Sequence, residues 1–196
     1  MPVRATAALG VGIASGLLSA AIVTSYQMGD VPAPKLFGYC VGMRMYGVCR
    51  GVDAALYLFP GSVFGVFFGA LERRRRIGFG RLLVFLPASG VANAVAVFLC
   101  IWLADRLPEI LHVDSVVLPM ALAGAISGAV GGALLSGTAT ALSLGLALRR
   151  SVLAAAALGL LVPLVVVWQV VGTLLFYAIW QGGYAAALGA SVTSET

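Results

Sequence analysis

Long apolar runs that end in clusters of arginine dominate this sequence. Residues 60–81 show the pattern best, because an apolar half with glycine at every fourth position is followed by five arginines. An apolar helix needs about 20 residues to cross the hydrocarbon core of a bilayer. Arginine and lysine gather on the cytoplasmic side of such helices. The segment therefore predicts a membrane span that stops at the cytoplasmic face.

The composition supports a membrane protein over a soluble one. Of the 196 residues, 61% are hydrophobic and only 10% are charged, whereas soluble domains carry roughly 25% charged residues. The length allows one helical bundle without a separate soluble domain. We therefore expect an all-α integral membrane protein with a single domain over residues 1–196, built from about five transmembrane helices (range four to six).

Five apolar runs are the expected spans. The fourth is too long for one untilted crossing, and the fifth contains Pro163, which is expected to kink it. For the first run a cleaved signal peptide is the competing interpretation, because Arg4 precedes an apolar stretch. An outer loop over 27–52, with a half-buried stretch around 37–48, and a polar tail from Gln181 onward complete the chain. The expected spans are 4–26, 53–71, 82–104, 116–148 and 152–180.

The basic residues predict the orientation of this five-span protein. If the N-terminus is cytoplasmic, the same side holds eight arginines and the opposite side holds four basic residues, in agreement with the positive-inside rule. The expected localisation is a bacterial inner membrane, with the C-terminus outside. The eight, which are also expected to meet lipid headgroups, are Arg4, Arg73, Arg74, Arg75, Arg76, Arg81, Arg149 and Arg150; the four are Lys35, Arg44, Arg50 and Arg106.

Small residues at a four-residue spacing mark three of the spans. Inside lipid there is little hydrophobic drive between helices, so close backbone approach holds a bundle together. These ladders predict GxxxG-type helix packing, either within the chain or against a second copy or a partner. Their glycines are Gly12 and Gly16 in the first span, Gly61, Gly65 and Gly69 in the second, and Gly124, Gly128 and Gly132 in the fourth.

Two amides are the clearest polar side chains expected at membrane depth. Asn93 lies six residues after Pro87, and Gln169 lies six residues after Pro163. Aligning the two prolines suggests a weak internal repeat that would place both amides at comparable depth. An amide in hydrocarbon needs a hydrogen-bonding partner. Asn93 and Gln169 therefore predict either interhelical hydrogen bonds or the lining of a solute path.

The outer loop carries sulfur-containing side chains. Cys40 and Cys49 are expected in an oxidising compartment, where a disulfide is the simplest outcome. Two free thiols are the second interpretation. A soft-metal site, with Met43, Met45 and His112 as weak candidates for Cu(I), is the third.

No motif for catalysis, nucleotide binding or nucleic-acid binding occurs, and we expect neither a catalytic residue nor a cofactor. The expected function is that of a non-catalytic structural or accessory subunit that associates through glycine-lined helix faces. The alternatives are a transporter or channel unit for a neutral or weakly polar solute, with Asn93 and Gln169 facing a cavity, and metal handling on the outer face. The expected partners are the lipid bilayer, a second copy or another membrane protein.

Overall fold

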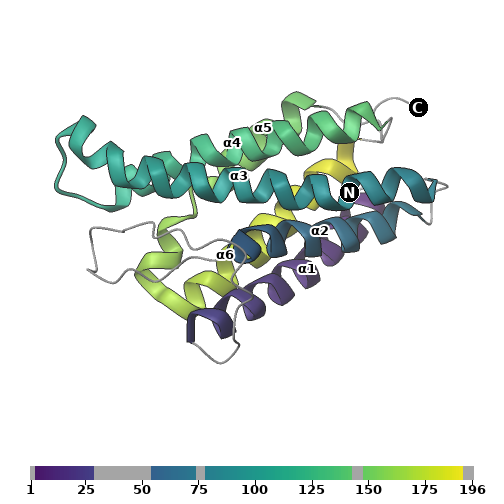
Figure 1. Ribbon diagram of the computed structural model, residues 1–196, viewed down its shortest axis with the longest axis horizontal. Helices are drawn as coiled ribbons and strands as arrows, with labels where there is room; N and C mark the ends of the chain where they lie inside the picture. The colour runs from purple at the N-terminus through teal and green to yellow at the C-terminus, as the bar shows by residue number, and fades with distance from the viewer. Residues whose placement is uncertain (1–2, 29–53, 74–77, 143–147, 192–196) are drawn as a thin grey trace.

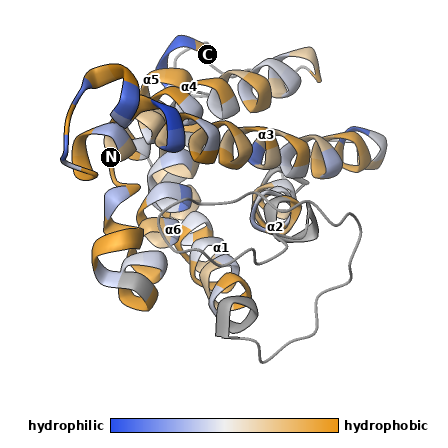
Figure 2. Ribbon diagram, turned by 60° about the vertical axis from the view of Figure 1, so that its left-hand side comes forward, coloured by the Kyte–Doolittle hydropathy of each residue, from blue (hydrophilic) through white to orange (hydrophobic). Residues whose placement is uncertain are grey.

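The computed structural model describes residues 3–28, 54–73, 78–142 and 148–191, and every element in this part of the chain is a helix. Backbone polar groups cannot be left without partners in hydrocarbon, so apolar segments of this length fold as helices. Hydrophilic segments lie toward the helix ends (Figure 2). The helices are α1 (Val3–Met28), α2 (Ala54–Arg73), α3 (Phe79–Leu111), α4 (Val117–Ala141), α5 (Leu148–Gly159) and α6 (Pro163–Ser191).

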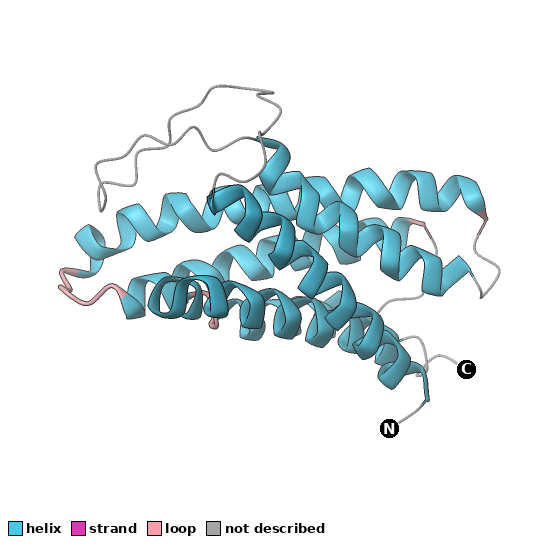
Figure 3. Cartoon of the chain, turned by 90° about the horizontal axis from the view of Figure 1, so that it is seen from below, coloured by secondary structure: helices cyan, strands magenta, loops and turns pink. Residues whose placement is uncertain are grey.

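The helices form a ring in chain order. Each packs against the next one along the chain, and α6 packs along α1 to close the ring (Figure 1). Gly12 of α1 lies against Gln181 and Gly182 of α6, whereas Gly16 lies against Tyr177 and Ala178. The two helices are therefore antiparallel, and the start of α1 lies beside the end of α6, as Figure 3 also shows.

Helix α6 is sharply bent near its first third. A Cβ added at Gly172 would overlap the carbonyl oxygen of Leu164, eight residues earlier. Eight residues of a straight helix rise about 12 Å, so the two turns lie side by side rather than end to end. The two sides of the bend belong to separate apolar spans, Leu148–Trp168 and Val170–Leu188.

The first of these two spans joins α5 to the start of α6 through a tighter turn. Leu161 and Val162 donate backbone hydrogen bonds three residues back, to Leu158 and Gly159. Pro163 has no N–H to donate and is well placed as the first residue of a helix. The proline therefore separates two helices within a span that still crosses the bundle.

Five segments of the described residues are long and apolar enough to cross a membrane, and α2 adds the shorter apolar helix Leu58–Leu71. The protein is thus a helical, multi-pass membrane protein, as the sequence predicts. Two expected boundaries differ from the structure. The predicted span 116–148 ends at Ala141 in α4, and the predicted span 152–180 divides into two passes at the bend of α6. The sequence prediction treats 152–180 as one pass, and it therefore misses the reversal of the chain direction within α6, near Gly172.

The additional pass also changes where the chain ends. We call the end of the bundle where α2 reaches Arg73 and α5 begins beside Arg149 the arginine end. Both the start of α1 and the end of α6 lie there (Figures 1 and 3). The sequence prediction of termini on opposite sides of the membrane counts five passes, and the orientation of the bundle in a membrane stays a prediction.

Candidate functional site

The glycines of α4 form a close seam with α5. A Cβ on Gly124 would overlap the carbonyl oxygen of Gly159, and a Cβ on Gly159 would overlap that of Gly124. Gly128 lies against the carbonyl of Ala155, and a Cβ on Gly132 would lie 2.6 Å from the Cβ of Ala155. Only glycine permits this approach of two backbones.

The glycines of α1 and α2 also face helices of the same chain. Added side chains at Gly12 and Gly16 would overlap the backbone of α6, and one at Gly61 would overlap the carbonyl of Ser89 in α3. A Cβ on Gly65 would overlap the Ser89 side chain, whereas one on Gly69 would lie 3.0 Å from Leu82 Cδ2. By contrast, Gly10 and Gly137 have open space where a Cβ would be.

A chain of six aromatic rings runs between α6, α2 and α3, and four of its rings, Tyr184, Phe64, Phe68 and Phe85, are fully buried. Successive ring centroids lie 5.6–6.5 Å apart, within the range of favourable aromatic pairs. Three rings come from α6, two from α2 and one from α3. Because the last part of α6 and α2 both run toward the arginine end, the rings follow one another along the bundle. In order, they are Phe176, Trp180, Tyr184, Phe64, Phe68 and Phe85.

Beside this aromatic chain, Gln181 joins three helices. Its side chain is fully buried. The amide oxygen accepts a 2.5 Å hydrogen bond from Ser15 of α1, and the amide nitrogen donates at 3.1 Å to Ser19 of α1 and to the carbonyl of Pro60 in α2. Gln181 thus meets the requirement that a buried amide be paired, and it ties α6 to α1 and α2.

Tyr184, one turn further along α6, ties this helix to α4. Its ring is fully buried, its hydroxyl donates at 3.2 Å to the carbonyl of Gly132, and it shares a 2.9 Å hydrogen bond with Ser136. On α3, Ser89 donates at 2.8 Å to the carbonyl of Gly61. Buried hydroxyls therefore fasten α6 to α4 and α3 to α2 at the same depth as the aromatic chain.

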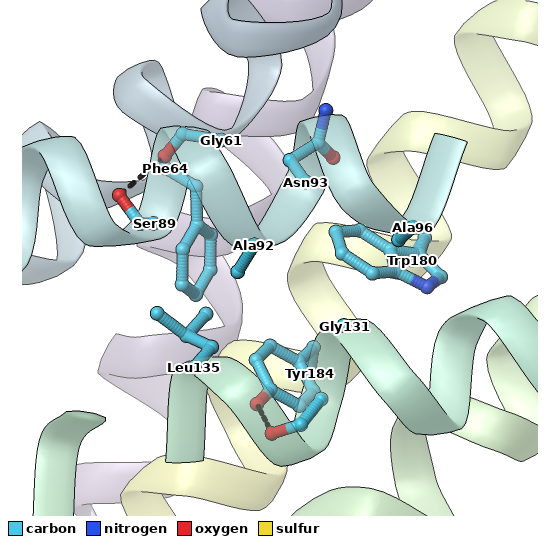
Figure 4. A pocket seen from close by; sticks show the side chains of 11 residues that line it. Gly61, Phe64, Ser89, Ala92, Asn93, Ala96, Gly131, Leu135, Trp180 and Tyr184 are labelled. Carbon is cyan, nitrogen blue, oxygen red and sulfur yellow. Dashed lines mark hydrogen bonds between the residues drawn. The ribbon is translucent and has the colours of Figure 1, made fainter. Parts of the chain in front are cut away.

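A small cavity lies between α2, α3, α4 and α6, and Asn93 lies at its wall (Figure 4). Its volume is about 10 Å³, which is room for about one water molecule. Small residues of α3 and α4 face the aromatic side chains of α2 and α6 across it. The lining residues that Figure 4 labels are Gly61, Phe64, Ser89, Ala92, Asn93, Ala96, Gly131, Leu135, Trp180 and Tyr184.

The two amides singled out in the sequence occupy different places. Asn93 lies in the middle of α3, whereas Gln169 lies at the bend of α6, at the end of the bundle opposite the arginines, and its side chain is outside the described residues. The alignment of Pro87 with Pro163 therefore does not correspond to equivalent positions: Pro87 is inside a helix and Pro163 begins one.

Several other predicted residues lie outside the described part of the chain. They are the basic turn residues Arg74, Arg75 and Arg76 and the loop residues Cys40, Cys49, Met43 and Met45, so the disulfide and the soft-metal site stay predictions. His112 is exposed and caps α3 in a left-handed conformation (φ 51°). Within the described residues, no three histidine, cysteine or acidic side chains gather as metal ligands would.

Sequence reasoning missed the central residues of α6. It assigned Gln181 to a polar tail, but α6 continues to Ser191. The signal was present: two glycines follow Gln181, and three alanines follow Tyr184, which together make a small-residue face.

Comparisons of the chain with protein-family models, curated proteins and solved structures found no match.

Proposed function

We propose that the protein is a non-catalytic structural or accessory subunit of a membrane. The observation that carries this proposal is the filled centre of the helix ring. Four fully buried rings of the aromatic chain occupy it, and the cavity beside them has a volume of only about 10 Å³. A path for a solute would need more space than this cavity offers.

The chemistry of the interior supports the same proposal. The buried polar side chains of the described residues are uncharged, whereas pumps and carriers of charged substrates usually carry an ionisable group at membrane depth. The hydroxyls and amide around α6 are engaged with one another or with backbone carbonyls. Such groups fasten helices together, which suits a rigid scaffold.

Association with a second copy or a membrane-protein partner is the natural role of such a scaffold. The ladder glycines face helices of their own chain, whereas Gly10, Gly80 and Gly137 are glycines of the described helices with open space where a Cβ would be. Of these, Gly10 lies within α1 and Gly137 within α4. Replacing either with leucine tests a glycine-mediated contact by native mass spectrometry from lipid nanodiscs. We expect Gly10→Leu or Gly137→Leu to release a partner copy without unfolding the bundle. Unchanged stoichiometry in both variants would argue against a glycine-mediated contact.

The scaffold proposal is tested most directly by a flux measurement. Proteoliposomes that contain the purified protein are mixed rapidly with iso-osmolar urea or glycerol, and swelling is followed by light scattering. We expect the rate of empty liposomes. Swelling that depends on the amount of protein would contradict the scaffold proposal.

A channel or transporter unit for a neutral solute is the second candidate. The observation that favours it is the position of the cavity, which places Asn93 beside Trp180 and Tyr184 where four helices meet. In this case the aromatic chain is a closed barrier. Phe64→Ala would then raise solute flux, and Asn93→Leu would abolish it while the bundle stays intact.

We further propose that both termini lie in the cytoplasm of a bacterial cell, with the arginine end facing inward. The eight arginines assigned to this end outnumber the four basic residues at the other, which fits the positive-inside rule. Labelling of single cysteines at positions 4 and 190 with an impermeant maleimide tests this orientation in intact cells. Neither position should react until the cells are opened.

Metal handling by the outer loop remains the least supported proposal.

A further inference from the structure

The contacts of glycine divide the described helices into two groups. Along α1 and α6, a Cβ on Gly12, Gly16 or Gly182 would meet first the atoms of the other helix of this pair. On α2 to α5, the glycines with close neighbours lie against helices of the same set or against Val162, in the turn after α5. We call α1 together with α6 from Gly172 onward the terminal pair, and α2 to α5 the central group.

The two groups touch each other through side chains. A Cβ on Gly183 of α6 would lie 3.0 Å from the side chain of Leu158 in α5. The side chain of Gln181 donates a 3.1 Å hydrogen bond to the carbonyl of Pro60, and the hydroxyl of Tyr184 bonds to α4. Helices α4 and α6 touch over a small area only. In the described residues, backbone therefore packs on backbone within each group, and side chains connect the groups.

The small cavity lies on the boundary between the groups. Trp180 and Tyr184 line it from the terminal pair, and residues of α2, α3 and α4 line it from the central group (Figure 4). Trp180 is half-buried and every other lining residue is buried, so little of the cavity wall reaches the outside. Because its walls belong to both groups, a change in their separation changes its volume.

The two kinds of contact resist movement differently. Helices whose backbones touch along several turns lose many close contacts when they slide or separate. Side chains can change rotamer and exchange partners, so contacts made through them allow more than one arrangement. We propose that the terminal pair moves as a rigid unit against the central group, and that this movement opens and closes the cavity. The movement needs no solute, so a scaffold built from two rigid groups would show it without any flux.

The bend of α6 is the hinge for this movement. It joins the groups at the end of the bundle opposite the arginines, where a Cβ on Gly172 would overlap the carbonyl of Leu164. The pass that leads into the bend, Leu148–Trp168, has 17% of its apolar stretch buried, against 33–39% in the other four candidate spans, so few contacts oppose a change of angle there. Rotation about the bend displaces the arginine end of the terminal pair most. The hydrogen bonds of Tyr184, in the half of α6 nearer that end, hold the closed arrangement.

Distances between spin labels, measured by double electron–electron resonance, test the movement. Gly10 on α1, Gly80 on α3 and Gly137 on α4 have no atom within 4 Å of an added Cβ, so labelled cysteines there leave the packing unchanged. Gly10→Cys/Gly80→Cys and Gly10→Cys/Gly137→Cys join the two groups, and Gly80→Cys/Gly137→Cys, within the central group, is the matched control. The full-length protein in nanodiscs is diluted with unlabelled copies, so that only distances within one chain are read. Its own cysteines, Cys40, Cys49 and Cys100, are replaced by serine.

Both pairs that include Gly10 should give two distances, and the control pair a single one. Tyr184→Phe removes hydrogen bonds between the groups and should raise the population at the longer distance, relative to the shorter, about threefold, the factor that corresponds to an average interhelical hydrogen bond in a membrane. Ser89→Ala removes a hydrogen bond within the central group and should leave this ratio unchanged. One narrow distance in the Gly10 pairs, unaffected by Tyr184→Phe, would overturn the proposal. Two distances in the control pair would also overturn it, because the central group would then not be rigid.

Discussion

The seam between α4 and α5 and the junction of α6 with α1 and α2 hold helices together in different ways. In the first, Gly124 and Gly159 let two backbones touch. In the second, the side chain of Gln181 reaches two serines and the carbonyl of Pro60. Both junctions are buried, and neither needs a charge. Within lipid, dispersion between close backbones and hydrogen bonds between helices are the two available sources of association.

Substitutions should therefore destabilise the two junctions by different amounts. At a backbone contact nothing can rotate away, so an added side chain forces the helices apart. At a side-chain contact the partners can find other groups, and the cost is limited to the lost hydrogen bonds. The comparison predicts that the glycine seam is the more sensitive of the two to single substitutions.

The largest effect is expected from Gly159→Leu. The new side chain would meet the carbonyl of Gly124, and overpacking a tight interior costs about 1–3 kcal/mol or more when backbone must move. We expect a loss of about 3 kcal/mol or more in the free energy of unfolding, measured by steric trapping in lipid bicelles.

Gly137→Leu is the matched control, because the space at Gly137 on α4 is open. Its stability should stay within about 0.5 kcal/mol of the wild type, as is usual for surface substitutions. Equal losses in the two variants would show that leucine in place of a helix glycine destabilises the bundle at either position, and the seam would then not explain the effect.

A smaller loss is expected from Gln181→Leu, which removes the hydrogen bonds to Ser15, Ser19 and Pro60. Interhelical hydrogen bonds in membranes are worth about 0.6 kcal/mol on average, with a maximum near 1.7. The variant should therefore lose about 1–2 kcal/mol in the free energy of unfolding. A double-mutant cycle with Ser15→Ala isolates the pair; a coupling energy of zero would rule out the short Ser15–Gln181 bond as a source of stability.

Tyr184→Phe is expected to cost still less, about 0.5–1.5 kcal/mol, because it removes only the hydroxyl. The ring keeps its packing against Phe64 and Trp180. Unfolding of Tyr184→Phe, Ser136→Ala and the double variant should be non-additive, since both substitutions break the same 2.9 Å bond. Strict additivity would mean that the hydrogen bond between Tyr184 and Ser136 contributes no stability.

The sequence predicts the general architecture of this protein well, for a physical reason. Hydrocarbon demands long apolar helices, and such helices are visible as runs of residues. The places where the chain reverses are less visible. The bend of α6 between Trp168 and Val170 is marked by neither a charge nor a proline, so hydropathy alone reads 152–180 as one span.

The central contacts were harder to predict than the helices. Asn93 stands out because it interrupts an apolar run, and it lines the cavity. Gln181 is equally buried, yet it follows the last strongly apolar residues and resembles the start of a tail. Which serines meet which amide depends on the antiparallel pairing of α1 with α6, and this pairing joins residues more than 160 positions apart.

The smallest expected effects come from replacing glycine with alanine. These variants separate the steric role of a glycine from its cost in backbone entropy. Gly137→Ala adds a methyl group where no atom lies within 4 Å, so the only expected change is the gain of about 0.5–1 kcal/mol from replacing glycine in a helix. Gly128→Ala would gain the same amount but lose more, because its Cβ would overlap the carbonyl of Ala155. Opposite signs in the unfolding free energies of the two variants would locate the sensitivity of α4 on the side that faces α5. A gain in both would show that α4 and α5 can move apart far enough to clear this contact. The glycine seam and the Gln181 junction would then differ only in degree.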